Sequence, residues 1–182
     1  MKDEKLVKLI LSDPDRGMRI LTDEYAGLIF AVIRKYLSSS LFSYADVEDC
    51  AAETLSDAYF GLKNFDASKS SLKTWLCTIA ERRAKDALRR YYRSSGTVPL
   101  DEAVNVGDVS VEDEAVSKAE KEALVKALGK LTRTEREIVV RKFYLSQSSK
   151  QIAEEMRLSV SNVDTKTHRA IEKLRRFLED MQ

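Results

Sequence analysis

Residues 148–170, SSKQIAEEMRLSVSNVDTKTHRA, decide the fold of the C-terminal part of the chain. Ser148 and the glutamine three residues later predict a capping box that opens a short helix. Ser159 predicts the start of a second helix after a turn of about three residues. The small Ala153 in the first helix and the apolar Val163 in the second are typical of a helix-turn-helix. Many helical hairpins share this pattern, so it does not by itself establish DNA binding.

The second helix of this pair adds a functional signal, because it is basic. Its cationic or titratable side chains are Lys166, His168, Arg169, Lys173, Arg175 and Arg176. In a helix-turn-helix the N-terminal part of this helix enters the major groove of DNA. The pattern therefore favours a DNA-facing helix.

Upstream of this motif the apolar residues keep helical spacing, and that spacing is lost in residues 94–116. The residues Thr134-Glu-Arg-Glu137 predict a capping box for one more helix. Residues 94–116 contain Pro99, Gly107 and scattered acids, and they predict a flexible acidic linker. Fully extended, that linker would reach at most roughly 75–80 Å. We therefore expect domains at 1–93 and 117–182.

The N-terminal domain is also predicted to be helical. Apolar residues recur with helical spacing from Met18 to Leu37, from Ser43 to Leu62 and from about Ser71 to Tyr92. Trp75 falls on an apolar stripe and is predicted to anchor the core. Six glycines and two prolines are too few for a turn-rich β-sandwich or barrel. The expected fold class is all-α, with two small helical domains joined by the linker.

Charges are segregated along the chain, although the net charge is only +1. Residues 46–57 hold five acids and no base, and residues 73–93 hold seven bases and two acids. Residues 101–122 are acidic again, and residues 157–176 are basic. One acidic row has helical spacing: Asp46, Asp49, Glu53 and Asp57. Such a row is unfavourable in an isolated helix and would be relieved by a cationic partner, although solvated faces explain many charge runs.

Composition excludes several classes of protein. No run of about 18 apolar residues occurs, and the first residues do not resemble a signal peptide. Two cysteines, Cys50 and Cys77, cannot form a disulfide framework or a four-ligand zinc site, so we expect a reduced cytoplasmic protein. The single histidine, His168, lacks a catalytic partner in the sequence, and no P-loop, GxGxxG or HExxH motif occurs. We expect no enzymatic activity, no metal and no cofactor.

Two blocks of the sequence resemble bacterial sigma factors. The residues DVEDCAAE at 46–53, NFD at 64–66 and TWL at 74–76 resemble sigma region 2. The residues ALGKL at 127–131, QIA at 151–153 and VDTKTHRA at 163–170 resemble sigma region 4. Only a variable linker separates the blocks, as in the compact extracytoplasmic-function (ECF) group. The resemblance implies binding to core RNA polymerase, to promoter DNA and, commonly, to an anti-sigma factor, with no domain expected after Gln182.

The resemblance also implies roles for individual residues. The polymerase-binding candidates are Asp46, Asp49 and Glu53. The candidates for reading the −10 element are Phe65, Asp66, Ser68, Lys69, Thr78, Arg82, Arg83, Lys85 and Arg89. The candidates for the −35 element are Arg157, Ser159, Ser161, Asn162, Thr165, Lys166, His168 and Arg169. A flipped base in the −10 loop would stack and bond there, and basic groups would bind phosphates.

Two positions depart from the family pattern. The turn of the helix-turn-helix often carries glycine, but here it is Arg157-Leu158, and Asp164 stands where the family often has a base. Asp164 would repel phosphate unless it accepts from a cytosine amino group or pairs with a neighbouring cation. The alternative functions are a stand-alone helix-turn-helix regulator and a helical protein-interaction module without DNA binding.

Overall fold

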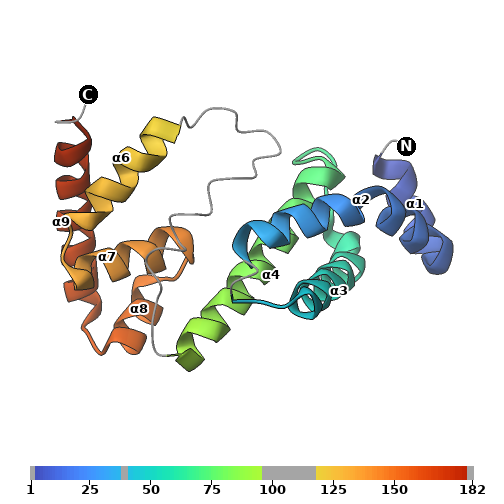
Figure 1. Cartoon of the computed structure of the whole chain (residues 1–182). Helices are drawn as coiled ribbons and strands as arrows, with labels where there is room; N and C mark the ends of the chain where they lie inside the picture. Colours follow the sequence, from blue (N-terminus) through green and yellow to red (C-terminus); the bar gives the residue numbers. More distant parts are fainter. Residues whose placement is uncertain (1–2, 38–40, 96–117, 180–182) are drawn as a thin grey trace. The chain divides into compact units, whose positions relative to one another are not determined.

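The computed structural model describes residues 3–37, 41–95 and 118–179 (Figure 1). Within these ranges every regular element is a helix, which confirms the all-α prediction. The chain divides into two compact units, residues 1–88 and 89–182, and each is described by itself. The predicted linker falls mostly outside the described residues, apart from its first two positions, which are helical.

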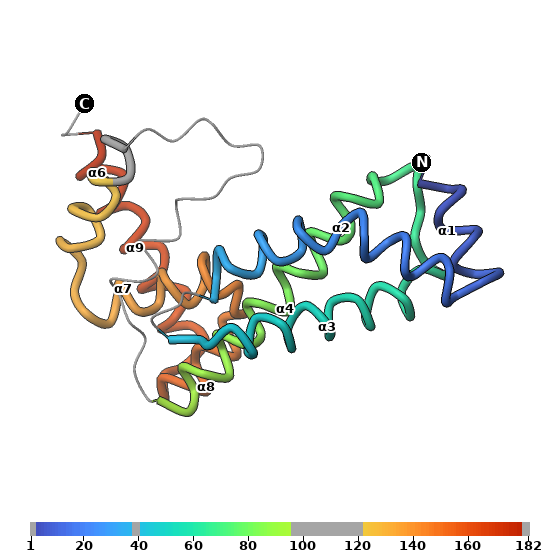
Figure 2. Tube along the Cα trace, turned by 45° about the vertical axis from the view of Figure 1, so that its right-hand side comes forward, coloured from blue at the N-terminus to red at the C-terminus, as the bar shows by residue number. Residues whose placement is uncertain are grey.

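In its described residues, the first unit has four α-helices and one short 3-10 helix. They are α1 (Asp3–Ser12), α2 (Pro14–Tyr36), α3 (Tyr44–Gly61), η1 (Leu62–Asn64) and α4 (Leu72–Ser95), the last of which continues past the unit boundary. Helices α2, α3 and α4 run alongside one another, and α1 packs against α2 (Figures 1 and 2). This arrangement leaves long outer surfaces on α3 and α4.

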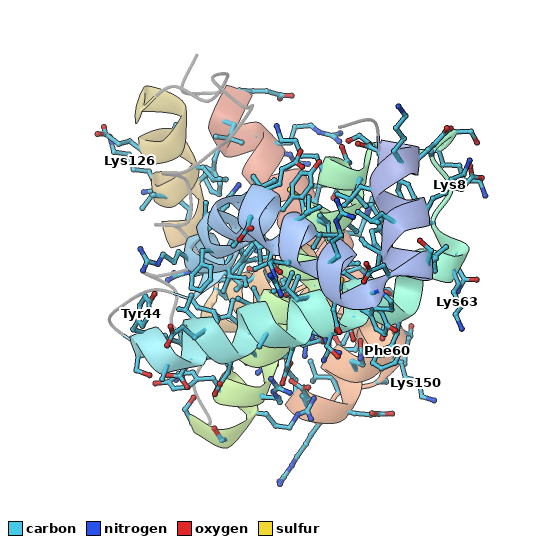
Figure 3. The ribbon with its side chains drawn as sticks, turned by 90° about the vertical axis from the view of Figure 1, so that its right-hand side faces the viewer. Lys8, Tyr44, Phe60, Lys63, Lys126 and Lys150 are labelled. Carbon is cyan, nitrogen blue, oxygen red and sulfur yellow. The ribbon has the colours of Figure 1, made fainter. Side chains whose placement is uncertain are left out.

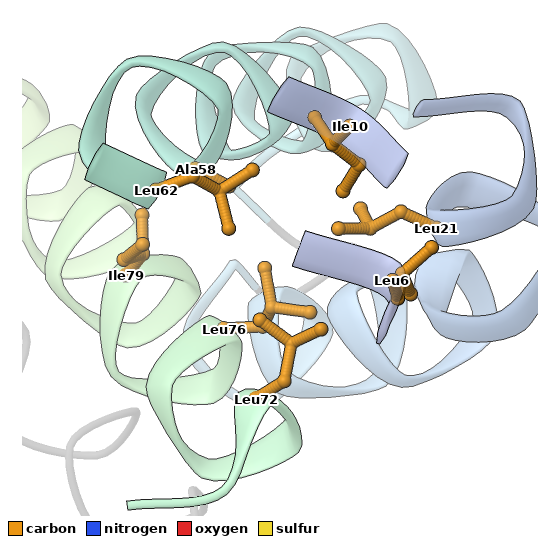
Figure 4. Close-up of a cluster of buried hydrophobic side chains, with 8 residues drawn as sticks. All are labelled: Leu6, Ile10, Leu21, Ala58, Leu62, Leu72, Leu76 and Ile79. Carbon is orange, nitrogen blue, oxygen red and sulfur yellow. The ribbon is translucent and has the colours of Figure 1, made fainter. Parts of the chain in front are cut away.

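Helix α1 is an element that the sequence patterns did not predict. Its Leu6 and Ile10 are buried in the main core of the first unit (Figure 4). That core consists of Leu6, Ile10, Leu21, Ala58, Leu62, Leu72, Leu76 and Ile79. A Cβ at Gly17 would lie 2.6 Å from the Cα of Ile10, so only glycine allows α1 and α2 to approach this closely. Helix α1 is thus an integral part of the core.

The N-termini of α3 and α4 are fixed by carboxylates and hydroxyls. A capping box opens α3: the Ser43 N–H donates to Asp46 Oδ2 over 2.7 Å, and the Asp46 N–H donates to Ser43 Oγ. At α4 the Leu72 N–H donates to Asp3 Oδ2 over 2.6 Å, and the Thr74 N–H donates to Ser71 Oγ over 3.1 Å. The carboxylate that caps α4 therefore comes from α1, 69 residues away in sequence.

The second unit contains α6 (Lys118–Gly129), α7 (Arg133–Val139), the π-helical segment η3 (Val140–Tyr144), α8 (Ser149–Met156) and α9 (Val160–Glu179). One apolar cluster joins α6, α7 and α9 through Ala127, Leu128, Leu131, Val139, Ala170 and Leu174. A second cluster, Ile138, Ile152, Ala153 and Val163, joins α7, α8 and α9. Helices α8 and α9 thereby form the predicted helix-turn-helix.

The capping box predicted at Thr134 is wrong by two residues. The cap is Thr132, whose Oγ accepts from the Glu135 N–H, while Glu135 accepts from the Thr132 N–H over 3.0 Å. Both threonines stand three residues before a glutamate, so the local pattern does not distinguish them. The choice follows from tertiary contact, because Glu135 also accepts from Lys173 of α9 over 2.6 Å.

Candidate docking and nucleic-acid surfaces

The acidic row on α3 divides into two halves. In the first half, Asp46 belongs to the capping box and its pKa is lowered by the hydroxyl and the N–H of Ser43. Asp49, one turn further along, is exposed. This half presents carboxylate oxygens to solvent, as expected of a docking surface for a cationic partner.

In the second half, the row has cationic partners within the chain. Arg83 of α4 donates through Nε to Asp57 Oδ2 over 2.6 Å and through Nη1 to Glu53 Oε2 over 3.3 Å. Arg82 donates to Asp57 Oδ2 over 3.0 Å. The Arg83 hydrogen bonds, and then the charges of Arg83 and Arg82, hold the pKa of Asp57 below its ordinary value. These contacts join α3 to α4 and offset the repulsion along the row.

Lys85, another predicted −10 contact, is only 14% exposed in its side chain. Its Nζ lies 2.7 Å from Glu81 Oε1 and 5.5 Å from the centre of the Tyr36 ring on α2. The Tyr36 hydroxyl donates to the same carboxylate oxygen over 2.9 Å, and burial raises the pKa of Tyr36 above its ordinary value. Lys85 therefore lies in a half-buried cluster between α2 and α4.

The loop predicted to bind the −10 element, residues 65–72, runs from the end of η1 to the first residue of α4. Phe65 packs on Trp75 with a ring separation of 5.3 Å, and both rings contact the core of the first unit, so the predicted role of Trp75 as an anchor agrees with its packing. Asp66 accepts from the N–H and hydroxyl of Ser68, which lower its pKa, and Lys69 Nζ lies 3.5 Å away. The loop thus presents an aromatic ring beside an ordered polar turn.

Other predicted −10 contacts lie along α4, and Phe60 lies at the end of α3. Thr78 is exposed on α4, and its hydroxyl donates to the Thr74 carbonyl over 3.0 Å. Arg82 keeps 63% of its side chain exposed, whereas Arg89 is partly exposed further along α4. Phe60, at the end of α3, is 73% exposed and projects from the helix surface (Figure 3). Phe60 lies outside the row of buried residues on α3, and the sequence patterns did not mark it as a functional residue.

In the helix-turn-helix, the turn departs from glycine at a cost in backbone strain. Arg157 adopts the left-handed conformation at φ 54° and ψ 44°, which non-glycine residues adopt less readily. Ser159 then opens α9, because its Oγ accepts from the Asn162 N–H over 3.2 Å. The predicted cap is confirmed, and the turn is compatible with arginine.

The predicted −35 contacts are distributed over the outer surface of the turn and α9. Arg157, Ser159, Ser161, Asn162, Thr165, His168 and Arg169 are exposed, and Lys166 is half-buried. Val163, Thr167 and Ala170 of the same helix are buried. The His168 imidazole lies 3.5 Å from Glu172, one turn further along. The structure thus brings the predicted −35 residues together on one accessible polar surface.

Asp164 has neighbouring partners within the helix-turn-helix. The Ser149 hydroxyl donates to Asp164 Oδ1 over 2.6 Å, and Lys142 Nζ lies 3.4 Å from the same oxygen. The sequence left two possible partners for Asp164, a cytosine amino group or a neighbouring cation. The structure contains the second, which is Lys142.

The described residues contain no group of three His, Cys, Asp or Glu side chains able to hold a metal ion. Cys50 is buried and Cys77 is half-buried, and neither belongs to a disulfide. Over the ranges that the structure covers, no helix combines the length and apolarity needed to cross a bilayer.

Comparison with protein families gives two matches. The family described as Sigma-70 region 2 matches residues 21–94, and the family described as Sigma-70, region 4 matches residues 121–174. The ECF RNA polymerase sigma factor SigL of Mycobacterium tuberculosis is 27% identical over 164 residues, with 90% of each chain covered. The ECF RNA polymerase sigma factor RpoE of Cereibacter sphaeroides is 25% identical over 149 residues, with 80% of each chain covered.

Among solved structures, CnrH in complex with the cytosolic domain of CnrY is 23% identical at a TM-score of 0.41, and 99% of each chain is covered.

Proposed function

The chain belongs to the ECF group of sigma-70 factors, with regions 2 and 4, and from this premise we propose that it directs core RNA polymerase to specific promoters. Region 2 would read the −10 element and region 4 the −35 element. Promoter DNA and core polymerase are then the partners, and the cytoplasm is the place of action. As in other members of the group, an anti-sigma protein is proposed as a third partner.

The observation that carries this proposal is the exposed polar surface at the start of α9. Ser161, Asn162 and Thr165 can donate to or accept from base edges, and Arg169 suits guanine or phosphate. The residues on the opposite side of the helix are buried in the apolar clusters of the second unit. A helix held in this way can present its outer surface to the major groove.

For core polymerase we propose the first half of the acidic row, Asp46 and Asp49, together with Glu53. Asp57 is engaged in a bidentate contact with Arg83 and is therefore better suited to joining α3 and α4. Exposed carboxylates on a docking helix attract a basic partner surface and orient its approach, and Glu53 would have to leave Arg83 to take part.

For the −10 element we propose the loop 65–72 with the exposed Thr78 and Arg82. The Phe65–Trp75 pair offers an aromatic surface on which an unstacked base can rest. The ordered Asp66–Ser68 turn offers polar groups to the edge of that base. Arg83, Lys85 and Arg89 remain predicted contacts, and Arg83 and Lys85 would have to leave their carboxylate partners to reach DNA.

The test is reconstitution of holoenzyme with Asp49→Arg plus Glu53→Arg. We expect loss of co-purification with core polymerase and loss of run-off transcription from a cognate promoter, with helicity retained. Asp23→Arg plus Glu24→Arg, two exposed acids of α2, is the matched control and should bind as the wild type does. Unchanged affinity of the α3 variant would refute this docking face. Stable duplex binding by the free wild-type chain, without any association with polymerase, would favour the stand-alone regulator instead.

A further inference from the structure

We propose that Asp164 is a positioning residue, which with Ser149 and Lys142 sets the orientation of α9 against α8 and thereby the choice of −35 sequence. This inference rests on the proposed reading of the −35 element by α9. It assigns Asp164 an indirect role, without a contact to base or phosphate.

The three side chains come from three consecutive elements of the second unit. Ser149 is the first residue of α8, Asp164 is the fifth residue of α9, and Lys142 belongs to η3. Lys142 Nζ donates to Ser149 Oγ over 2.5 Å, and Ser149 Oγ donates in turn to Asp164 Oδ1 over 2.6 Å. Lys142 Nζ also lies 3.4 Å from Asp164 Oδ1, which closes the cluster.

The hydroxyl of Ser149 is used in both directions. It accepts from an ammonium group and donates to a carboxylate, an arrangement in which charge-assisted hydrogen bonds strengthen one another. The Ser149 hydroxyl, followed by Lys142, holds the pKa of Asp164 below its ordinary value, so the carboxylate is ionised at neutral pH. Its charge is balanced by Lys142, which reduces its repulsion of nearby phosphates.

Apolar packing alone constrains the rotation of α9 less closely than hydrogen bonds do. Ile152 and Ala153 of α8 pack with Val163 of α9, and such contacts are non-directional. A hydrogen bond is directional, because it weakens steeply away from linear geometry. The cluster therefore adds an orientational constraint at the point where α8 begins and the reading surface of α9 lies.

The residues next to Asp164 are those that must meet the bases. Asn162 and Thr165 stand two residues before and one residue after it, and both are exposed. A displacement of about 1 Å at such side chains is enough to misalign hydrogen bonds in a recognition surface. Loss of the constraint should therefore change base preference at several positions together.

The experiment uses reconstituted holoenzyme and a promoter library randomised over the −35 element. Wild type is compared with Asp164→Asn, Asp164→Ala, Ser149→Ala and the double alanine variant, and relative affinities are measured at several salt concentrations. Circular dichroism establishes that each variant keeps its helicity. Lys150→Ala, an exposed neighbour of Ser149 on α8, is the matched control.

We expect Asp164→Ala and Ser149→Ala to reduce discrimination against mismatched −35 sequences by the same factor, about three- to tenfold, over several base pairs. The double variant should be no worse than either single variant, because the two residues act as one unit. Asp164→Asn keeps an acceptor for the Ser149 hydroxyl and should retain most of the discrimination. The salt dependence should stay unchanged, since no phosphate contact is removed.

Four results would overturn this role while the −35 reading stands. Loss of preference at a single base pair in the Asp164 variants only would show direct contact with a base. A rise in the affinity of the Asp164 variants for all sequences alike would show that Asp164 repels phosphate. A fall in affinity for all sequences alike would show that its role is purely structural. Variants that discriminate among −35 sequences as well as the wild type does would also overturn this role. A wild-type holoenzyme that ignores the −35 sequence would overturn the proposed function and this role with it.

Discussion

Helices α4 and α9 both carry basic residues at helical spacing, but they use them differently. On α4, Arg82 and Arg83 bind Asp57, and Lys85 lies against Glu81 and Tyr36. On α9, the polar residues of the first turns are exposed, and the basic residue that pairs with a carboxylate of another helix lies further along, where Lys173 binds Glu135. The comparison shows that a basic row can join helices or remain exposed, and that spacing does not distinguish the two.

Several ion pairs of the second unit lie away from the proposed reading surface of α9, whereas the pair of Asp164 with Lys142 lies within it. Besides Lys173, the buried Arg141 of η3 donates to Glu137 over 2.9 Å, to Gln147 over 3.3 Å and to Glu155 of α8. In the first unit the ion pairs involve the predicted DNA contacts themselves. Substitutions should therefore separate stability from DNA affinity in the second unit and mix them in the first.

The largest expected effect is on the second unit, at Glu135. Lys173, followed by the Thr132 groups, lowers the pKa of Glu135 from 4.5 to about 2. Because the folded pKa is the lower one, this stabilisation is present above pH 4.5 and is lost as the pH falls from about 4.5 to 2. Glu135→Gln should cost about 2–3 kcal/mol at neutral pH, and the difference from wild type should vanish in acid.

Hydrogen exchange of the α7 and α9 amides between pH 2 and 7 measures this difference. The only tryptophan, Trp75, lies in the first unit, so its fluorescence transition serves as an internal control and should not move. A cost that is independent of pH would contradict the ion-pair account. At temperatures where the variant is folded, its −35 binding should keep the wild-type salt dependence.

The next largest effect concerns two basic residues of α9. Lys166→Ala plus Arg169→Ala should weaken binding to the −35 element and reduce the slope of log K against log salt by about 2, since each phosphate contact contributes about 0.9. Stability should change little, because Arg169 is exposed and Lys166 is only half-buried. The control, Arg175→Ala plus Arg176→Ala, removes the same charge from the later turns of α9. A slope equal to that of wild type would place the phosphate contacts elsewhere.

The smallest effects distinguish the two neighbouring arginines of α4. Arg83→Ala should destabilise the first unit by about 1–2 kcal/mol, because it removes the bidentate partner of Asp57. Arg82→Ala should cost less than about 1 kcal/mol, yet reduce the salt slope for single-stranded −10 DNA bound to holoenzyme by about 0.7. Urea unfolding followed by Trp75 fluorescence measures the first quantity, and oligonucleotide binding measures the second.

Arg90→Ala, an exposed arginine of the same helix, is the control for both measurements. If Arg83→Ala were neutral for stability and lowered the salt slope, Arg83 would be a DNA contact and α4 would resemble α9 after all.

Local signals predicted most helices, whereas elements that depend on distant contacts were missed. The caps at Ser43, Ser148 and Ser159 follow from residues within three positions. Helix α1 was missed, since its ten residues gain their stability from burying Leu6 and Ile10 in a core built by other helices. The cap at Thr132 was misplaced because Lys173, 38 residues further along, helps to hold Glu135 there.

For the candidate site, the sequence indicated which residues lie on the outer surface of α9. The apolar Val163 among polar residues predicts a buried and an exposed side of α9, and burial agrees, with Thr167 and Ala170 also on the buried side. It did not indicate that Glu53 and Asp57 are engaged by α4, because complementary charge on two helices says nothing of their distance. The exposed Phe60 likewise had no periodic signal that distinguishes it from an ordinary surface residue.

By itself, the sequence determined the all-α class, the helix-turn-helix, most of the caps and the sigma-70 family. These follow from interactions within a few residues and from motifs that can be read in order. The tertiary structure alone decided which charges are paired: Asp3 with the start of α4, Asp57 with Arg83, and Asp164 with Ser149. The reason is physical, since a charge pairs only with what the fold brings within about 3 Å.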